Sequence, residues 1–472
     1  MIRSLGWLGC CTQAVLCKDY LYRAPQRPGA LVSSTSIGRI PGAKTRRSGS
    51  PLPGRAEVVP KRVVILGGGT GGTLAANRLR RVLSDDDFTI VVIDQDDRHL
   101  YQPGLLFVPF GLTRPEEITR PRRRQLHAGI EFLQNSVDHV DVAGGRVHLT
   151  DGEQLDYDVL VVATGSSLLP QETEGLTGPG WGKNVHTFYT ADGATALNDA
   201  LTKFEGGRLV VNVVDMPIKC PVAPLEFCFL ADWYLRQRGI RERVEISYVS
   251  PLDGAFTKPV CNRELSGLLE QKGVGLVTEF NTGSVDGLGG RLVAYDGREV
   301  PFDLAVVVPL HGGAPYVGNS PGLGDELGFI PVNEHSLQST SAPNVFALGD
   351  AANVPTSKAG SVAHFEGEVL VENVRRFLSA EPLTARFDGH TNCFIETGFR
   401  KALLIDFNYD TEPLPGHFPG RVGLPLLKES RLNHLGKLSF EWLYWHALLA
   451  GRDIPGIGSA MPRHGKRFQA TG

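Results

Sequence analysis

A short apolar strand runs directly into a glycine-rich turn at residues 61–72, and this stretch constrains the fold more than any other. It reads Lys-Arg-Val-Val-Ile-Leu-Gly-Gly-Gly-Thr-Gly-Gly, so that Gly67, Gly69 and Gly72 fit the spacing G-x-G-x-x-G. The first glycine permits a tight turn, the second lets the backbone approach a pyrophosphate, and the third allows close packing of helix on strand. The pattern predicts a dinucleotide cradle, followed by a helix over roughly 70–82 whose N-terminus faces the phosphates.

The residues after the turn supply the rest of a β-α-β unit. A second apolar strand, Phe88 to Ile93, ends at Asp94, about 20 residues past the last glycine, where a ribose-binding carboxylate is expected. An acid rather than an arginine at this place favours a free 2'-hydroxyl, and therefore FAD or NAD over NADP. A glycine turn in some other α/β protein is the alternative interpretation.

Two later strand ends carry residues suited to a flat cofactor. The strand from Tyr157 ends in Ala163-Thr164-Gly165, small residues that let backbone lie against a planar ring. A strand from Ala342 ends in Gly349-Asp350, where the carboxylate can accept a hydrogen bond from a ribityl hydroxyl of a flavin. These ends, together with the first turn, point to FAD.

A second α/β unit begins near Trp181 but carries no nucleotide turn. Its buried strand, Arg208 to Val214, runs into Asp-Met-Pro-Ile-Lys-Cys-Pro at residues 215–221, where the glycines of a second cradle would stand. The strand and helix pattern therefore continues while the nucleotide site is lost. We predict an α/β fold with two Rossmann-like domains of the FAD/NAD(P)-binding type, the second degenerate, and a C-terminal membrane-docking region.

The expected domain boundaries follow from these patterns and from two unusual ends. Residues 1–60 are rich in Arg, Ser, Pro and Gly and hold only two acidic residues. An organellar transit peptide, a disordered tail and translated upstream sequence all have this composition. We favour the disordered tail or the upstream sequence. The C-terminal part crowds aromatic and leucine residues among bases, which suits a membrane interface or a helix packed on the body. The parts are residues 1–60 as an extension, 61–180 and 300–380 as the FAD-binding domain, 181–299 as the degenerate domain with Cys220, and 381–472 as the C-terminal region with Cys393.

Composition excludes several classes of protein. The 472 residues carry a formal net charge of −3, which argues against a nucleic-acid binder. No run of 18 apolar residues predicts a membrane-spanning helix. The seven cysteines show no metal-ligand spacing and are too few for a secreted disulfide scaffold, so we expect no metal and a small number of redox-active thiols. The basic run Arg120 to Arg124 is expected to form a solvated face.

Five segments of the chain together resemble the sulfide:quinone oxidoreductases. They are the glycine turn, Ala163-Thr164-Gly165, the segment ending in Gly349-Asp350, Lys219-Cys220-Pro-Val-Ala-Pro-Leu-Glu226 and Thr391-Asn392-Cys393. These are flavoproteins with two dinucleotide-binding domains, within the pyridine nucleotide-disulfide reductase superfamily. The resemblance covers residues 61 to about 460. It implies FAD as cofactor, sulfide and a membrane quinone as partners, and attachment through the C-terminal aromatic segment, with a homo-oligomer left open. It further implies that Lys358 lies near the flavin and that Val362, His364 and Phe365 help to form the quinone pocket.

Sulfur exchange uses a thiolate as nucleophile, and a second thiol lets an oxidised enzyme hold a bridge that hydrosulfide can open. Cys220 and Cys393 are the proposed pair, with Glu226 as a proton carrier. Either cysteine could carry the persulfide; we favour Cys393, with the thiolate on Cys220. Cys228 and Cys261 match no family position and are interpreted as buried small hydrophobes. The expected location is peripheral on the cytoplasmic membrane, or on the mitochondrial inner membrane if residues 1–60 are a transit peptide.

Two other functions compete with sulfide oxidation. A type II NADH:quinone reductase would need a second nucleotide cradle, whose glycines are missing near 210–220. A non-catalytic flavoprotein that senses redox state would not require both Cys220 and Cys393. The predicted site therefore comprises Cys220, Cys393 and Glu226 as catalytic residues and, as cofactor-binding residues, Gly67, Gly69, Gly72, Asp94, Thr164, Gly165, Gly349, Asp350 and Lys358.

Overall fold

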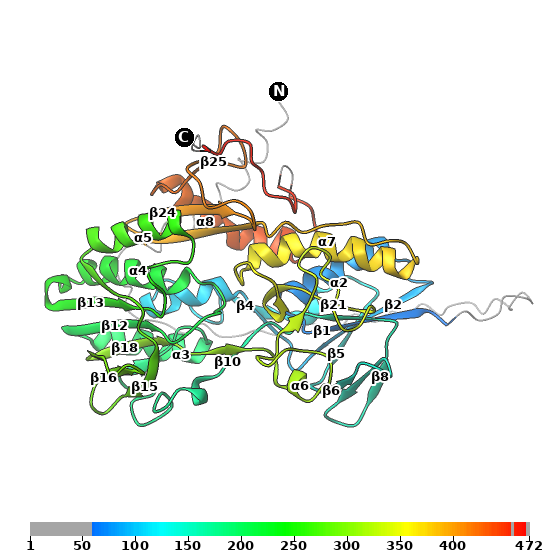
Figure 1. Cartoon of the computed structure of the whole chain (residues 1–472), viewed down its shortest axis with the longest axis horizontal. Helices are drawn as coiled ribbons and strands as arrows, with labels where there is room; N and C mark the ends of the chain where they lie inside the picture. Colours follow the sequence, from blue (N-terminus) through cyan, green and yellow to red (C-terminus); the bar gives the residue numbers. More distant parts are fainter. Residues whose placement is uncertain (1–58, 455–456, 469–472) are drawn as a thin grey trace, which may run out of the picture. The chain divides into compact units, whose positions relative to one another are not determined.

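A computed structural model of the chain describes residues 59–454 and 457–468. The extension expected at residues 1–60 lies outside the described residues except for its last two positions. The described chain is mixed α/β and contains two five-stranded parallel sheets (Figure 1), which confirms the predicted fold class.

The first sheet has the strand order β21-β9-β1-β2-β5, all parallel. Its central strand β1 (Lys61–Leu66) is followed by helix α2 (Thr70–Val82), which has the predicted bounds. Alternate side chains of β1 pack into two different clusters, because successive residues of a strand point to opposite faces. The remaining strands are β2 (Phe88–Asp94), β5 (Ile130–Gln134), β9 (Val159–Val162) and β21 (Val345–Ala347).

Both faces of this sheet are covered. Helices α2 and α7 (Gly360–Leu378) pack on one face, where Leu79 and Leu370 belong to the same buried cluster as Val63. The other face meets the antiparallel strands β6 (Val137–Asp141), β7 (Arg146–Leu149) and β8 (Gln154–Asp156), and the short helix α6 (Pro315–Gly318). Burial on both faces explains why the strands are apolar throughout rather than alternating.

The second sheet has the order β11-β18-β12-β13-β14 and is also parallel. The expectation that the chain returns to the first domain at residue 300 is wrong, because β18 (Leu304–Val308) pairs with β12 (Gly207–Val213) in this sheet. The chain crosses between the sheets at β10 (Ser167–Leu168) and β19 (His311–Gly312), which pair with each other. The other elements are β11 (Val185–His186), β13 (Val244–Val249), β14 (Val274–Val277), α3 (Ala191–Lys203), α4 (Ala223–Gln237), α5 (Pro259–Gln271), β15 (Thr282–Asp286), β16 (Arg291–Ala294) and β17 (Glu299–Pro301).

The C-terminal part begins with the hairpin β23 (Thr391–Gly398) and β24 (Lys401–Phe407), and continues to helix α8 (Arg431–Leu443) and the π-helical turn η7 (Tyr444–Leu448). Its large apolar residues divide between two environments: Tyr444 and Trp445 are buried, whereas Leu432 and Trp442 are 51% and 38% exposed. Among the described residues, no helix is long and apolar enough to cross a membrane. Short strands complete this part and the first domain: β3 (Arg98–Leu100) with β4 (Thr119–Pro121), β20 (Ile330–Pro331) with β22 (Ala352–Asn353), and β25 (Gly416–Phe418) with β26 (Leu424–Leu426).

Candidate active site

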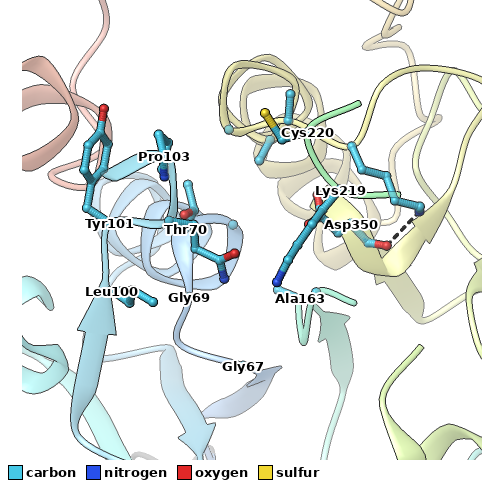
Figure 2. A pocket seen from close by; sticks show the side chains of 18 of the residues that line it. Gly67, Gly69, Thr70, Leu100, Tyr101, Pro103, Ala163, Lys219, Cys220 and Asp350 are labelled. Carbon is cyan, nitrogen blue, oxygen red and sulfur yellow. Dashed lines mark hydrogen bonds between the residues drawn. The ribbon is translucent and has the colours of Figure 1, made fainter. Parts of the chain in front are cut away.

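One cavity of about 630 Å³ brings together residues from the first domain, the second domain and the C-terminal part. Its volume lies within the usual range for small-molecule sites. Figure 2 shows Gly67, Gly69 and Thr70 on one side, and Cys220, Lys219 and Asp350 on the other. Of the predicted site residues, those that line it are Gly67, Gly69, Asp94, Thr164, Gly165, Cys220, Glu226, Gly349, Asp350, Lys358 and Cys393. Gly72 does not line the cavity.

The glycine turn has the shape that a dinucleotide requires. A Cβ at Gly69 would meet nothing within 4 Å, so the backbone there borders open space at the start of α2. A Cβ at Gly72 would lie 1.8 Å from the carbonyl oxygen of Gly67, and this contact accounts for the third glycine. Gly165 and Gly349 have φ values of +69° and +67°, and Gly165 likewise has open space at its Cβ position. The residues present therefore fit FAD, with the α2 N-terminus facing its pyrophosphate.

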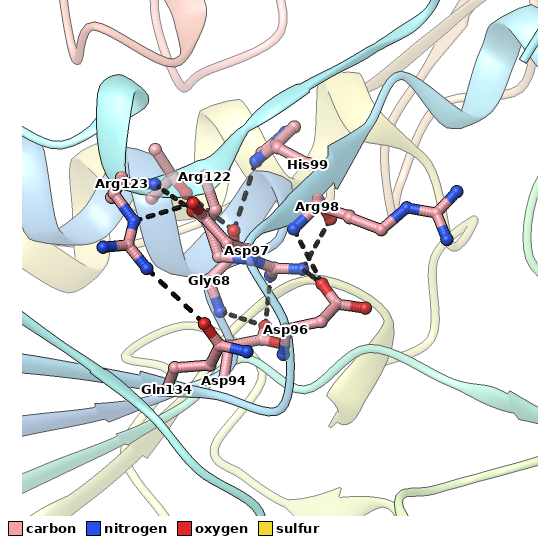
Figure 3. A network of polar contacts seen from close by, with 10 residues as sticks. Gly68, Asp94, Asp96, Asp97, Arg98, His99, Arg122, Arg123 and Gln134 are labelled. Atoms are coloured by element: carbon pink, nitrogen blue, oxygen red, sulfur yellow. Dashed lines mark hydrogen bonds and ion pairs between the residues drawn. The ribbon is translucent and has the colours of Figure 1, made fainter. Parts of the chain in front are cut away.

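Asp94 ends β2 as predicted and joins a network at the edge of the cradle (Figure 3). Its Oδ2 accepts hydrogen bonds from the Gly68 amide at 2.7 Å and from Arg122. Burial raises the pKa of Asp94, and Arg122 and the Gly68 amide oppose that shift. Arg122 also donates to Asp96 at 3.0 Å. The expected solvated face at residues 120–124 is therefore wrong for Arg122, which is 7% exposed.

Cys220 stands in the segment that replaces the second cradle, between β12 and α4. Its amide donates to the Lys358 carbonyl at 2.7 Å, which fixes this segment to the first domain. Its φ of +50° is a left-handed conformation that costs energy in a residue with a side chain, and such strain gathers at functional sites. Burial, and then the Glu226 carboxylate, raise the pKa of the thiol to about 12.

Cys393 lies on strand β23, opposite Ile405. The Ser361 hydroxyl donates to the neighbouring Asn392 carbonyl at 2.7 Å and ties the strand to α7. Burial, followed by the charge of Cys220, raises the pKa of Cys393. Both cysteines are free and partly buried. Cys228 and Cys261 are fully buried, as predicted.

Glu226 is buried in the first turn of α4 and is not a surface residue. It forms an ion pair with Lys437 of α8 and accepts a hydrogen bond from the Glu396 amide at 2.6 Å. Burial raises the pKa of Glu226, while Lys437 counteracts this. Burial acts to lower the pKa of Lys437, but Glu226 outweighs it and the net shift is upward. Sequence reasoning missed Lys437, whose only signal was its place among aromatic residues.

Lys358 lines the cavity, whereas part of the helix after it differs from expectation. The Lys358 ammonium donates to the carbonyls of Asp350 and Ala352 at 2.8 and 3.1 Å, and lies 3.9 Å from the centre of the Phe329 ring. Among the described residues around the cavity, Ser361 and Ala363 of α7 line the wall. Val362, His364 and Phe365 are buried and do not line it, so the structure gives them no part in a pocket at this place.

Comparison with known proteins gives a consistent result. The model of the pyridine nucleotide-disulphide oxidoreductase family matches residues 61–213. The mitochondrial sulfide:quinone oxidoreductase of Dictyostelium discoideum is 29% identical over 399 residues, covering 83% of this chain and 86% of that protein. The corresponding mouse protein is 24% identical over 400 residues, covering 82% and 86%. The crystal structure of sulfide:quinone oxidoreductase from Aquifex aeolicus has the same fold, with a TM-score of 0.71 at 20% identity, covering 83% of this chain and 92% of the other.

The fold and the cradle, with these matches, are those of an FAD-dependent oxidoreductase, and residues 61–213 are similar to the pyridine nucleotide-disulphide oxidoreductases. Over more than four fifths of its length the chain is similar to the sulfide:quinone oxidoreductases, and the resemblance seen in its motifs is thereby confirmed.

Proposed function

We propose that this protein oxidises sulfide to sulfane sulfur and passes two electrons to a quinone, using Cys220 and Cys393 as its redox pair. The observation that carries the proposal is that both cysteines line the same cavity as the FAD cradle. The names of the relatives support sulfide and quinone as the two substrates. In the overall reaction, hydrogen sulfide loses two electrons and two protons, and quinone becomes quinol.

The chain's own residues account for the sulfur steps. In the oxidised enzyme the two cysteines form a disulfide, and hydrosulfide attacks the Cys393 sulfur. A new bond forms between the two sulfur atoms, the Cys220–Cys393 bond breaks, and its electron pair leaves with Cys220 as a thiolate. The sulfane sulfur then leaves to a second sulfide or another thiol, and Cys393 remains as a thiol. When the Cys220–Cys393 bond forms again, the two cysteines give up two electrons and one proton. FAD, held by the cradle at residues 67–72, would supply the acceptor for these electrons and the route to quinone.

Glu226 would carry a proton at this site. Its carboxylate lies in the cavity wall beside Cys220, and Lys437 favours its ionised form. A thiol with a raised pKa holds its proton unless a base accepts it, so Glu226 would act when Cys220 or Cys393 loses a proton. The neighbouring ammonium keeps the negative charge of the carboxylate compensated during this transfer.

The location that best suits this function is the surface of a quinone-containing membrane. Leu432 and Trp442 are exposed on α8, and bases stand around that helix. Relatives named as mitochondrial support the mitochondrial inner membrane if residues 1–60 are a transit peptide. A membrane quinone would then reach the flavin from this side.

The test compares electron donors on the purified flavoprotein. Sulfide or NADH is added without oxygen, the bleaching of the flavin absorbance is followed, and a soluble quinone is then added. We expect bleaching by sulfide but not by NADH, with colour restored by quinone. Bleaching by NADH alone would replace the proposal with an NADH:quinone reductase, for which the segment after β12 offers no glycine cradle. Bleaching by neither would favour a redox sensor.

A further inference from the structure

Three lysines line the cavity in the described part of the chain, and one of them differs from the others. Lys437 pairs with Glu226 and donates to the Phe394 carbonyl at 3.2 Å. Lys358 donates to two backbone carbonyls. The ammonium of Lys219 has no hydrogen bond or ion pair with any described residue, and its Nζ lies 6.0 Å from the centre of the Tyr189 ring. Lys219 is therefore the one lysine of this wall whose charge is left for a ligand.

The backbone holds Lys219 firmly in this place. Lys219 pairs with Lys358 in a parallel bridge, and the next amide, that of Cys220, donates to the Lys358 carbonyl at 2.7 Å. The Tyr189 hydroxyl donates to the Cys220 carbonyl at 3.3 Å. In Figure 2 the side chain of Lys219 extends from the Cys220 segment into the space toward Ala163. A fixed backbone and an extended side chain together aim the ammonium into the cavity.

The surroundings of the Lys219 ammonium favour a bound anion. Burial lowers the pKa of Lys219, while Asp350 and Cys220 act in the opposite direction. The same positive charge contributes, after burial, to a His311 pKa lowered to about 4. Lys219 is partly buried, and an anion that enters beside its ammonium compensates the charge.

We propose that Lys219 binds the hydrosulfide anion and holds it in the cavity near the Cys220–Cys393 disulfide before the attack on Cys393. This inference rests on the proposed sulfide oxidation and adds to it the group that captures the substrate. Negative charge begins on the incoming sulfur and ends on the Cys220 sulfur when the Cys220–Cys393 bond breaks. Because Lys219 and Cys220 are adjacent in the chain, one ammonium can compensate the charge at both stages, and no proton has to move.

The first test measures anion capture without using turnover. Reduced, FAD-loaded protein is treated with iodoacetate, which is an anion, or with iodoacetamide, which is neutral, and alkylation of Cys220 is followed by peptide mass spectrometry. Both reagents react with the thiolate of Cys220, so the ratio of their rates does not depend on the fraction of Cys220 that is ionised. We expect Lys219→Met to lower this ratio about tenfold, Lys219→Arg to keep it near the wild-type value, and Lys203→Met, an exposed lysine at the end of α3, to leave it unchanged.

The second test measures the sulfide concentration that gives half the maximal rate of flavin bleaching. Lys219→Met is expected to raise it about tenfold with unchanged FAD content. If that variant loses its flavin, Lys219→Gln repeats both comparisons with a neutral side chain that keeps a polar end. An alkylation ratio equal to that of the wild type in the neutral variants would overturn the role of Lys219. A wild-type protein that sulfide does not bleach would instead overturn the proposed function, and with it the choice of hydrosulfide.

Discussion

The phenol oxygen of Tyr444 lies 2.8 Å from the hydroxyl of Thr70 and 2.7 Å from Nε2 of His99. Nδ1 of His99 lies 3.2 Å from the Gly68 carbonyl, which can only accept, so Nδ1 carries the proton. Burial first, and then Arg122, lower the pKa of His99 to about 3, so the ring is neutral at ordinary pH. Nε2 therefore accepts from Tyr444, which in turn accepts from Thr70. This relay fastens the C-terminal turn η7 to the first residue of the cradle helix.

Removing the Tyr444 hydroxyl should loosen that attachment. Tyr444→Phe removes the partner of His99 Nε2 and of the Thr70 hydroxyl, and we expect a loss of about 1–3 kcal/mol in the free energy of unfolding. Proteolysis of the C-terminal part should become faster. Denaturant unfolding and limited digestion measure both effects, with Trp442→Phe, on the exposed side of α8, as the control. Equal stability of Tyr444→Phe and wild type would contradict the relay.

Arg122 should matter for stability, whereas its neighbour Arg123 should not. Arg122→Met leaves the Asp94 carboxylate partly buried without its counter-charge, at an expected cost of about 3 kcal/mol. Asp94→Asn in the same chain should recover much of that loss. Arg123→Met breaks an ion pair with Asp97 that is largely exposed and should cost less than about 1 kcal/mol. A double-mutant cycle by denaturant unfolding gives the comparison, and similar costs for the two arginines would rule out the buried pair.

Breaking the ion pair between Glu226 and Lys437 should also destabilise the fold, and it should affect the chemistry of the cysteines as well. Lys437→Met leaves a buried carboxylate unpaired, which we expect to destabilise the fold by about 3–5 kcal/mol and to raise the pKa of Glu226 further. Adding Glu226→Gln should restore most of the stability but not the rate of sulfide-driven flavin bleaching. Recovery of both by the double variant would remove Glu226 from the proton transfer.

Glu366 predicts a dependence of stability on pH. Its side chain is fully buried on α7, one oxygen accepts from the Gly349 amide, and burial raises its pKa to about 8 from 4.5. The folded state thus binds a proton that the unfolded state releases, so the associated stability is complete below pH 4.5 and is lost as pH rises through 8. Glu366→Gln should resemble the wild type at pH 5 and exceed it by on the order of 3 kcal/mol at pH 9. Thermal unfolding at the two pH values measures this; equal differences at both would contradict it.

The parts of the site that could be predicted from the sequence are those set by local backbone. The cradle could be predicted because Gly67 needs a positive φ and Gly72 lies against a carbonyl oxygen, requirements that only glycine meets. The apolar strands β1 and β2 and helix α2 followed from periodicity, and their bounds agree closely with the structure.

The remaining features depend on pairings between distant segments. Lys437 reaches Glu226 across 211 residues, and Tyr444 reaches Thr70 across 374. Nothing in the local pattern around Arg122 indicates that its charge is buried. The sequence of β18 does not indicate which sheet it joins, because both sheets bury apolar strands on two faces. Such contacts depend on how the chain folds back on itself, which spacing and composition do not encode locally.

The central claim is that Cys220 and Cys393 form the redox pair, and anaerobic single-turnover bleaching of the flavin tests it most directly. Cys220→Ser and Cys393→Ser should each keep FAD bound and yellow and yet lose sulfide-driven bleaching, while Cys261→Ser, a buried thiol outside the cavity wall, keeps it. Bleaching at the wild-type rate in either of the first two variants would contradict the claim.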